Sequence, residues 1–591
     1  MLTDFLPTTR KELDLRGWDE VDVILFSGDA YVDHPSFGMA VIGRTLEAAG
    51  YRVAIVPQPD WHGDWRDFKK LGRPRLFFAI TAGSMDSMVN HYTAARRLRS
   101  DDAYSPDGRF GLRPDYCTTV YSKILKQLYP DVPVVIGGIE ASMRRLCHYD
   151  YWQDKLLPSI LISSEADVLV YGMGEKAIVE LARRAEKNQS LQGVMQTAYV
   201  VSFKPTDTEA IMLHSYEGCM KSKRAYAENF RSIEEQSNRW HGTRMIEPHA
   251  DKFVVVEPMN PPMTTEEIDR SFDLPYARAP HPKYKGKTIP AFEMIKFSIN
   301  MHRGCFGGCS FCTISAHQGK QVSSRSKESI LREVKKVAES PDFKGYLSDL
   351  GGPSANMYMM HGKDLSLCEK CKRPTCLQPS ICPNLNQDFG PLLDIYRSVD
   401  ALPEIKKSFI GSGIRYDLMS EEYGREVITR HVSGRLKVAP EHTSPTVLSL
   451  MRKPSFDQFH RFARFFEKVN KEAGLNQQLI PYFISSHPGC KVEDMAELAI
   501  ETKALNFRLE QVQDFTPTPM TLSTVMYYTG LHPYTMQPVF VARTKEDKQH
   551  QRMFFFWYKH EEQPLIRREL NRIHRPDLVQ SLLGKQAKQK R

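Results

Sequence analysis

Three cysteines in a short glycine-containing loop are the residues of this sequence best suited to chemistry. Cys305, Cys309 and Cys312 follow the spacing C-x-x-x-C-x-x-C, and Gly307 and Gly308 let the loop fold back on itself. Thiolates grouped this closely are ligands for soft metals such as zinc or the iron of an iron–sulfur cluster. In a cubic 4Fe-4S cluster, three cysteines would leave one iron open to a further ligand.

The loop resembles the signature of radical S-adenosylmethionine (SAM) enzymes, because the aromatic Phe311 directly precedes the last cysteine. The resemblance implies that the three cysteines hold a 4Fe-4S cluster, that Phe311 belongs to the cofactor-binding set, and that SAM binds the open iron. One electron, from a reductant such as flavodoxin or ferredoxin, then cleaves SAM to a 5'-deoxyadenosyl radical. The alternative is a zinc loop completed by His302 or His317, although zinc loops favour paired C-x-x-C units.

A second group of cysteines lies further along the chain, at Cys368, Cys371, Cys376 and Cys382. Four thiols with one C-x-x-C pair form a closed ligand set, which suits either structural zinc or an auxiliary iron–sulfur cluster; the sequence does not choose between them. Seven of the eleven cysteines belong to these two groups, which favours reduced thiols committed to metal over scattered disulfides. No residue is assigned as a catalytic base or radical relay.

Strand and helix signals alternate over residues 291–530. The expected strands are 295–301, 345–350, 409–412, 436–439, 479–484 and 509–513. Six such units, with the cysteine loop after the first strand and the second cysteine group in an insertion at 361–388, match the partial (β/α)6 barrel of radical SAM enzymes. Active sites of such barrels lie at the carboxyl ends of the strands.

Loops at these strand ends resemble SAM-contacting motifs. Gly351 and Gly352 are similar to the glycine-rich motif that approaches the SAM amino group, where missing side chains give room. Pro353 stands where the family often has an acidic residue, so that a backbone carbonyl or Asp349 must take that role. Later strand ends add three segments expected to contact SAM or substrate, 412–415, 440–442 and 485–487, of which Ser412 and Glu441 are assigned to the cofactor-binding set.

Residues 1–185 are expected to form an open, doubly wound parallel α/β sheet. The expected strands are 21–26, 53–56, 76–80, 134–136 and 168–170. Segments 136–138 and 167–175 resemble the second half of cobalamin-binding domains. The lower-axial motif Asp-x-His-x-x-Gly is absent, because Asp33 and His34 are adjacent. We therefore favour a docking or substrate domain that keeps only this architecture, with cobalamin binding as the alternative.

The remaining segments carry weaker signals. Residues 186–290 are expected to be a linker or cap, with a polar helix over 215–240 and a proline-rich run over 258–290. Residues 531–591 form a C-terminal extension, in which the aromatic run 554–558 seals the barrel and the basic end 584–591 is disordered. Basic residues interleaved with aromatic ones also give weak support to nucleic-acid binding.

Composition places the chain among large globular proteins. Its 591 residues suggest three or four domains, and the net charge of +9 permits an acidic partner without requiring one. No stretch approaches the roughly 20 apolar residues of a membrane span, and residues 1–19 lack the apolar core of a signal peptide. We therefore expect a cytoplasmic protein with no membrane partner.

Five parts of the chain together are similar to the YgiQ-like iron–sulfur proteins of the radical SAM superfamily. These parts are the α/β front domain, the cysteine loop 302–312, the cysteine insertion, and the segments 439–444 and 513–519. The resemblance implies a radical SAM enzyme of unassigned substrate. The alternative from another functional class is a metal-stabilised RNA- or protein-binding factor that binds SAM without consuming it.

Overall fold

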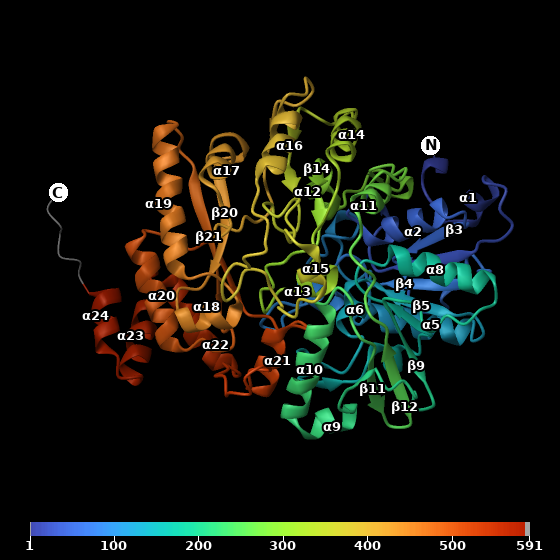
Figure 1. Cartoon of the computed structure of the whole chain (residues 1–591), viewed down its shortest axis with the longest axis horizontal. Coiled ribbons are helices and arrows are strands. Elements are labelled where there is room, and N and C mark those ends of the chain that lie inside the picture. The colour runs from blue at the N-terminus through green and yellow to red at the C-terminus, as the bar shows by residue number, and fades with distance from the viewer. Residues whose placement is uncertain (1, 585–591) are drawn as a thin grey trace.

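The N-terminal half of the chain is built on one nine-stranded sheet (Figure 1). The structure, a computed structural model, describes residues 2–584. Five strands of the sheet pair in parallel: β1 (Val23–Ser27), β3 (Val53–Pro57), β4 (Phe77–Thr81), β5 (Val134–Gly137) and β8 (Val168–Val170). Their spatial order is β3-β1-β4-β5-β8, a doubly wound order with its switch point between β1 and β4. The expected doubly wound parallel sheet is confirmed.

Alternating residues of these strands enter two separate cores. In β1, Ile24 and Phe26 pack in the core that contains residues of α5 (Cys117–Leu128). Val23 and Leu25 pack in the core formed with α2 (Gly38–Ala48) and α8 (Glu175–Glu186). Because both faces are covered, the strands are continuous apolar runs, which is why the sequence located them well.

Part of segment 186–290, expected to be a linker or cap, instead extends this sheet. Four added strands are β9 (Thr197–Val201), β10 (Ile211–Met212), β11 (Met245–His249) and β12 (Lys252–Val256). β11 and β12 form a tight antiparallel hairpin, and β12 pairs with β9. The linker prediction was wrong here because Pro248 and the polar turn mask a strand signal that is clear at 253–256. The expected polar helix is present as α9 (Tyr216–Lys221) and α10 (Lys223–Ser237).

Glu247 on β11 makes the stability of this added hairpin sensitive to pH. Its carboxylate is buried and accepts a hydrogen bond from the backbone N–H of Cys147 at 2.9 Å, and burial raises the pKa of Glu247 to about 8. The folded-state pKa lies above the unfolded value, so the contribution to stability is full below about pH 4.5 and is lost as pH rises through about 8.

Glu247→Gln is therefore expected to flatten the pH dependence of stability by an amount on the order of 4 kcal/mol between pH 5 and pH 9. Urea unfolding midpoints of both proteins at these two pH values measure the effect. Equal pH dependence in the two proteins would contradict the assignment.

The C-terminal half forms the expected partial barrel. Its strands, in chain order, are β14 (Ser298–Asn300), β17 with β18 (Tyr346–Leu347 and Asp349–Gly351), β19 (Lys407–Ser408), β20 (Arg435–Glu441), β21 (Gln478–Ser485) and β22 (Gln511–Asp514). Every pairing among them is parallel. Helices between the strands are α14 (Lys327–Ala338), α16 (Gly390–Asp400), α17 (Glu421–Glu426), α18 (Pro445–Met451), α19 (Phe456–Glu472) and α20 (Val492–Ala504).

Two barrel strands differ from their predicted bounds. The first is shorter, because α12 (Pro290–Ile295) takes up its start, and proline favours the first turn of a helix. The third falls earlier than 409–412, because the backbone N–H groups of Gly411 and Ser412 donate to the Asp349 carboxylate and not to a neighbouring strand.

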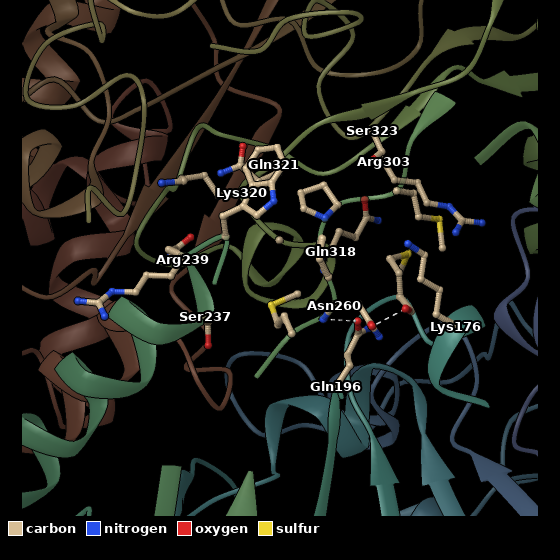
Figure 2. A pocket seen from close by; sticks show the side chains of 18 residues that line it. Lys176, Gln196, Ser237, Arg239, Asn260, Arg303, Gln318, Lys320, Gln321 and Ser323 are labelled. Carbon is tan, nitrogen blue, oxygen red and sulfur yellow. Dashed lines mark hydrogen bonds between the residues drawn. The ribbon is translucent and has the colours of Figure 1, made fainter. Parts of the chain in front are cut away.

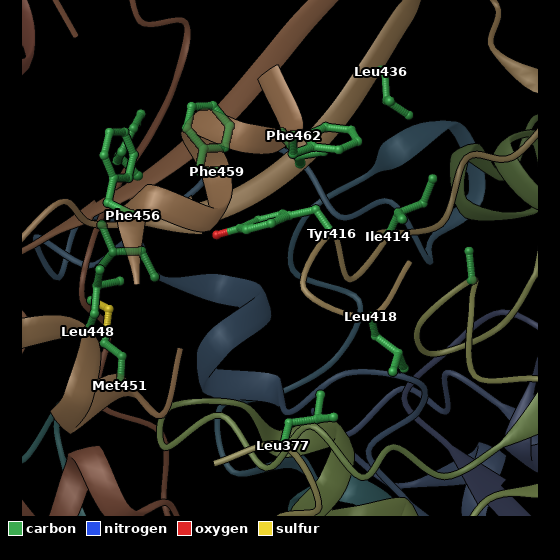
Figure 3. Close-up of a cluster of buried hydrophobic side chains, with 14 of the residues drawn as sticks. Leu377, Ile414, Tyr416, Leu418, Leu436, Leu448, Met451, Phe456, Phe459 and Phe462 are labelled. Carbon is green, nitrogen blue, oxygen red and sulfur yellow. The ribbon is translucent and has the colours of Figure 1, made fainter. Parts of the chain in front are cut away.

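The cysteine insertion shares the hydrophobic core of the barrel. It contains one short helix, α15 (Leu365–Glu369), while Leu377 and Leu385 are buried in the barrel core. Figure 3 shows Leu377 in the same cluster as Leu418 and Tyr416, whose ring stacks on Phe462. The insertion is therefore anchored to the barrel by apolar packing as well as by its backbone.

α21 (Leu522–Thr529) ends the barrel region, and the C-terminal extension packs on the barrel through α22 (Lys545–Arg552), α23 (Gln563–Arg572) and α24 (Pro576–Leu583). Phe554 and Phe555 are fully buried in the barrel core, as expected of an aromatic run that seals it. The basic end predicted to be disordered lies outside the described residues from position 585 onward. Among the helices of residues 2–584, none has the length and apolarity needed to cross a bilayer.

Candidate functional site

The cysteine loop follows directly on the first barrel strand. β15 (His302–Arg303) pairs with β16 (Ser323–Ser324), and the loop with α13 (Thr313–Gln318) lies between them. Gly304 has a φ of +87°, and a Cβ there would overlap the carbonyl oxygen of Gln321. The start of the loop therefore requires glycine both for its backbone conformation and for the close approach of the returning chain.

Gly304→Ala is expected to distort this loop, and Gly434→Ala provides a matched control. Gly434, also in the barrel, has a φ of +98° but nothing within 4 Å of an added Cβ. Both substitutions carry a left-handed backbone penalty of about 1–2 kcal/mol, but only Gly304→Ala adds the overlap. We expect iron retention to fall several-fold in Gly304→Ala alone, measured after anaerobic reconstitution and desalting. Equal retention in the two variants would contradict this account of the loop.

The three thiols of the loop lie close enough for their charges to interact. Burial raises the pKa of Cys305, and the neighbouring Cys309 raises it further. Burial, with Cys309 and Cys305, raises the pKa of Cys312 to about 12. The three cysteines can all be deprotonated in this buried loop only if a cation offsets their negative charge, as a metal centre does.

The donor set suits a cluster, in which each thiol ligates a different iron. Within residues 2–584, no group of three or more His, Cys, Asp or Glu side chains is placed to hold a single metal ion.

Basic side chains from later strand ends stand beside the thiols. Arg415 donates to Cys309 Sγ at 3.5 Å and, through Nε and Nη2, to the two carboxylate oxygens of Asp417 at 2.8 and 2.6 Å. Lys453 Nζ lies 3.7 Å from Glu441 Oε1. Burial raises the pKa of Glu441, while the charges of Lys453 and Arg415 oppose the rise. Glu441 therefore lies in the same region as the cysteine loop. Arg415 belongs to the strand-end segment 412–415 that the sequence indicated, whereas Asp417 and Lys453 are additions that sequence reasoning did not assign.

The predicted glycine motif is tightly packed. A Cβ at Gly351 would overlap the Ser412 hydroxyl, and one at Gly352 would overlap the His302 ring. Asp349 accepts hydrogen bonds from two successive backbone N–H groups of the third strand end, at 2.9 and 3.1 Å, and from the Ser412 hydroxyl. The structure thus brings Gly351 and Ser412 together, and Asp349 holds the loop that carries Ser412.

Residues that follow the last two barrel strands hold the cysteine loop in place. His487 Nδ1–H donates to the carbonyl oxygen of Pro488 at 2.8 Å, so its Nε2 accepts from the Ser523 hydroxyl at 2.6 Å. Ser310, between two cluster cysteines, lies 2.8 Å from Ser523 Oγ and donates to it. The ring of Phe311 meets His487 edge-on at 6.1 Å. A buried polar chain from α21 and from the loop after β21 therefore fixes Ser310 and Phe311.

The four cysteines of the insertion line one cavity of about 510 Å³. The backbone N–H of Cys376 donates to the carbonyl oxygen of Phe306 at 3.1 Å. The second cysteine group thus lies directly against the loop of the first.

Another cavity, of about 400 Å³, lies at the carboxyl ends of the doubly wound sheet. Its walls include the glycine-containing strand ends 137–138 and 172–174, and Ile314 and His317 of α13 line it from the barrel side. The sequence predicted the sheet side of this cavity but not the contribution of the helix that follows Cys312.

Asp33 and His34, the residues nearest to the absent cobalamin motif, are held by local contacts. Asp33 forms a buried ion pair with Arg44, and His34 Nδ1 accepts the backbone N–H of Ser36 at 3.1 Å. Pro35 and Ser36, but neither Asp33 nor His34, line the cavity at the sheet edge.

A small groove of about 70 Å³, whose lining side chains Figure 2 shows, shares lining residues with both cavities. Gln196 accepts the backbone N–H of Asn260 at 3.3 Å across its floor. Gln318 lines both the groove and the sheet cavity, whereas Lys320 lines both the groove and the cysteine cavity. The residues at and just after the end of α13 therefore separate the two cavities.

Comparison with family models gives two matches. A model described as "Radical SAM N-terminal" matches residues 5–298, and a model for a domain of unknown function (DUF3362) matches residues 510–587. Among solved structures, the radical SAM methyltransferase TsrM from Kitasatospora setae, with cobalamin and a [4Fe-4S] cluster bound, is similar at a TM-score of 0.49 and 16% identity. The match covers 85% of this chain and 74% of that one.

Curated relatives match over nearly the whole chain. A UPF0313 protein of Bacteroides thetaiotaomicron is 63% identical, with 99% of each chain covered. A UPF0313 protein of Methanocella arvoryzae is 46% identical over 97% of this chain and 96% of its own. YgiQ of Escherichia coli is 42% identical over 98% of this chain and 87% of its own. The chain therefore belongs to the UPF0313 family of radical SAM proteins, which includes YgiQ.

Proposed function

We propose that this protein is an enzyme in which Cys305, Cys309 and Cys312 hold a 4Fe-4S cluster for the reductive cleavage of SAM. The main support is the placement of three mutually interacting thiols at the carboxyl end of the first strand of a parallel partial barrel. When bound, such a cluster supplies one electron to SAM, which gives methionine and a 5'-deoxyadenosyl radical that abstracts hydrogen from a substrate.

The basic residues beside the thiols would balance charge in the loaded site. Arg415 is fixed by two hydrogen bonds to Asp417 and directs a third to Cys309, so its position does not depend on a ligand. Lys453 faces Glu441 in the same region. In this proposal Arg415 donates a hydrogen bond to the Cys309 sulfur in the loaded site, and the Lys453–Glu441 pair offers one cationic and one anionic group to the polar part of SAM.

The glycine pair and its neighbours would shape the SAM pocket. Gly351 and Gly352 admit the Ser412 hydroxyl and the His302 ring, which occupy the space where side chains would lie, and the Ser412 loop is held against Gly351 by Asp349. As the family resemblance implies, the backbone at this strand end is proposed to contact the SAM amino group. Phe311, held against His487, is proposed to pack on the adenosine part.

Anaerobic reconstitution followed by SAM cleavage tests the proposal. The protein is loaded with iron and sulfide, reduced with dithionite and incubated with SAM, and 5'-deoxyadenosine and methionine are measured against samples without reductant. A one-electron carrier such as flavodoxin or ferredoxin is expected to replace dithionite. An intact, reduced cluster that yields neither product would count against the enzyme and favour a SAM-binding factor that does not consume SAM.

Cobalamin binding in the cavity at the sheet edge can be tested in the same preparation. After incubation with hydroxocobalamin and desalting, we expect no stoichiometric corrin absorbance, because the motif residues Asp33 and His34 are held elsewhere. Retained corrin would overturn our preference for a docking or substrate domain.

A further inference from the structure

We propose that Cys368, Cys371, Cys376 and Cys382 hold a second iron–sulfur cluster, and not zinc, against the loop of the first cysteine group. The proposal concerns metal content alone and does not depend on SAM cleavage. It rests on the size of the cavity between the thiols, on a buried lysine and on the hydrogen bonds that join the two loops.

The size of the cavity favours a cluster over a single ion. Four thiolates around zinc lie about 2.3 Å from the ion and leave no free volume between them. The four cysteines of the insertion instead line a cavity of about 510 Å³, which also includes Phe306 and Lys320 in its wall. One water molecule needs roughly 10–15 Å³ of such space, so the pocket accommodates a group of several heavy atoms, such as a cube of iron and sulfide. Within residues 2–584, no three or more His, Cys, Asp or Glu side chains are placed to hold a single ion.

Lys320 indicates that the four thiols are bound as thiolates around a metal centre. Its side chain is 3% exposed, and its Nζ lies 2.7 Å from the carbonyl oxygen of Arg373 and 3.8 Å from Cys371 Sγ. Within the part of the chain that the structure describes, no carboxylate lies within ion-pair distance of this ammonium group. A buried cation is costly unless it is paired, and four thiolates around either zinc or a 4Fe-4S core leave the net negative charge that would pair it, so Lys320 supports a metal centre here and the cavity supports the cluster.

The two cysteine loops are joined by backbone hydrogen bonds. The Thr375 hydroxyl lies 3.0 Å from the carbonyl oxygen of Phe306 and 2.9 Å from that of Gly307, and Cys376 N–H donates to Phe306. A Cβ at Gly308 would lie 2.7 Å from Thr375 Cβ, so the loops are in contact there. Phe306 directly follows Cys305 and lines the second cavity, which makes it the side chain between the two metal sites.

Metal analysis of a variant without the first site tests the proposal. The triple variant Cys305→Ala, Cys309→Ala, Cys312→Ala is reconstituted anaerobically with iron and sulfide in the presence of equimolar zinc, and then desalted. We expect about four iron and about four acid-labile sulfide per chain, with a Mössbauer spectrum typical of a 4Fe-4S cluster. The wild-type chain is expected to retain about eight iron under the same conditions.

Two results would overturn the proposal. The first is a triple variant that binds about one zinc per chain and no sulfide. The second is a wild-type chain that retains only about four iron, and this measurement does not depend on the folding of the triple variant. Lys320→Gln is expected to lower iron retention several-fold in the triple variant. Lys363→Gln is the matched control. Lys363 lies on the cysteine insertion and is exposed, and its Nζ donates to the Pro383 carbonyl oxygen at 3.3 Å. Equal retention in the two lysine variants would contradict the role of Lys320.

Discussion

Cys309→Ala is expected to lower the rate of 5'-deoxyadenosine formation by at least about 10³-fold, which corresponds to about 4 kcal/mol of barrier. The substitution removes one of three proposed iron ligands together with the acceptor of the Arg415 hydrogen bond. A cluster with two protein ligands has no defined open iron, so SAM would lose its binding position as well as its electron source. Product formation per chain, measured with dithionite and excess SAM, gives the effect.

Cys117→Ala is the matched control for this variant. Cys117 is also a cysteine that is not in a disulfide, but it is buried in the N-terminal core at the start of α5. The control is expected to keep wild-type iron content and SAM cleavage. If Cys309→Ala retained cleavage within tenfold of the control, the assignment of the first cluster would be wrong.

Features of the fold and site that depend on neighbouring residues could be predicted from the sequence. The three cluster cysteines lie within eight positions of one another, from 305 to 312, so their spacing alone indicates a common centre. The buried strands β1, β3, β4 and β5 were located well, because apolar runs covered on both faces have a strong local signal. The hairpin of β11 and β12 was missed, since its strands lie at the margin of the sheet and contain polar residues and a proline.

Contacts between distant positions could not be predicted in this way. Arg415 and Cys309 are 106 positions apart, and Ser523 and Ser310 are 213 positions apart. No periodicity or motif links such residues, because their approach depends on how the barrel closes. The cavity between the four insertion cysteines is also a property of packing, which is why the sequence left the choice between zinc and a cluster open.

Arg415→Met is expected to destabilise the barrel by about 3 kcal/mol, because it leaves the buried carboxylate of Asp417 without its main partner. The Asp417 side chain is 5% exposed, and the charge of Arg415 and its hydrogen bonds hold the pKa of Asp417 low against the effect of burial. The double variant Arg415→Met, Asp417→Leu removes both charges and is expected to recover most of the lost stability. Thermal unfolding of the reconstituted proteins measures both changes.

The same pair of variants separates the stability role of Arg415 from its effect on the first cluster. A hydrogen bond to a cluster sulfur raises the reduction potential, and both variants lose the contact between Arg415 Nη1 and Cys309 Sγ. We therefore expect both to have a lower potential in a redox titration followed by paramagnetic resonance, and SAM cleavage at least about tenfold slower. Full recovery of the potential in the stable double variant would show that Arg415 acts only through folding and would contradict its proposed contact with the cluster.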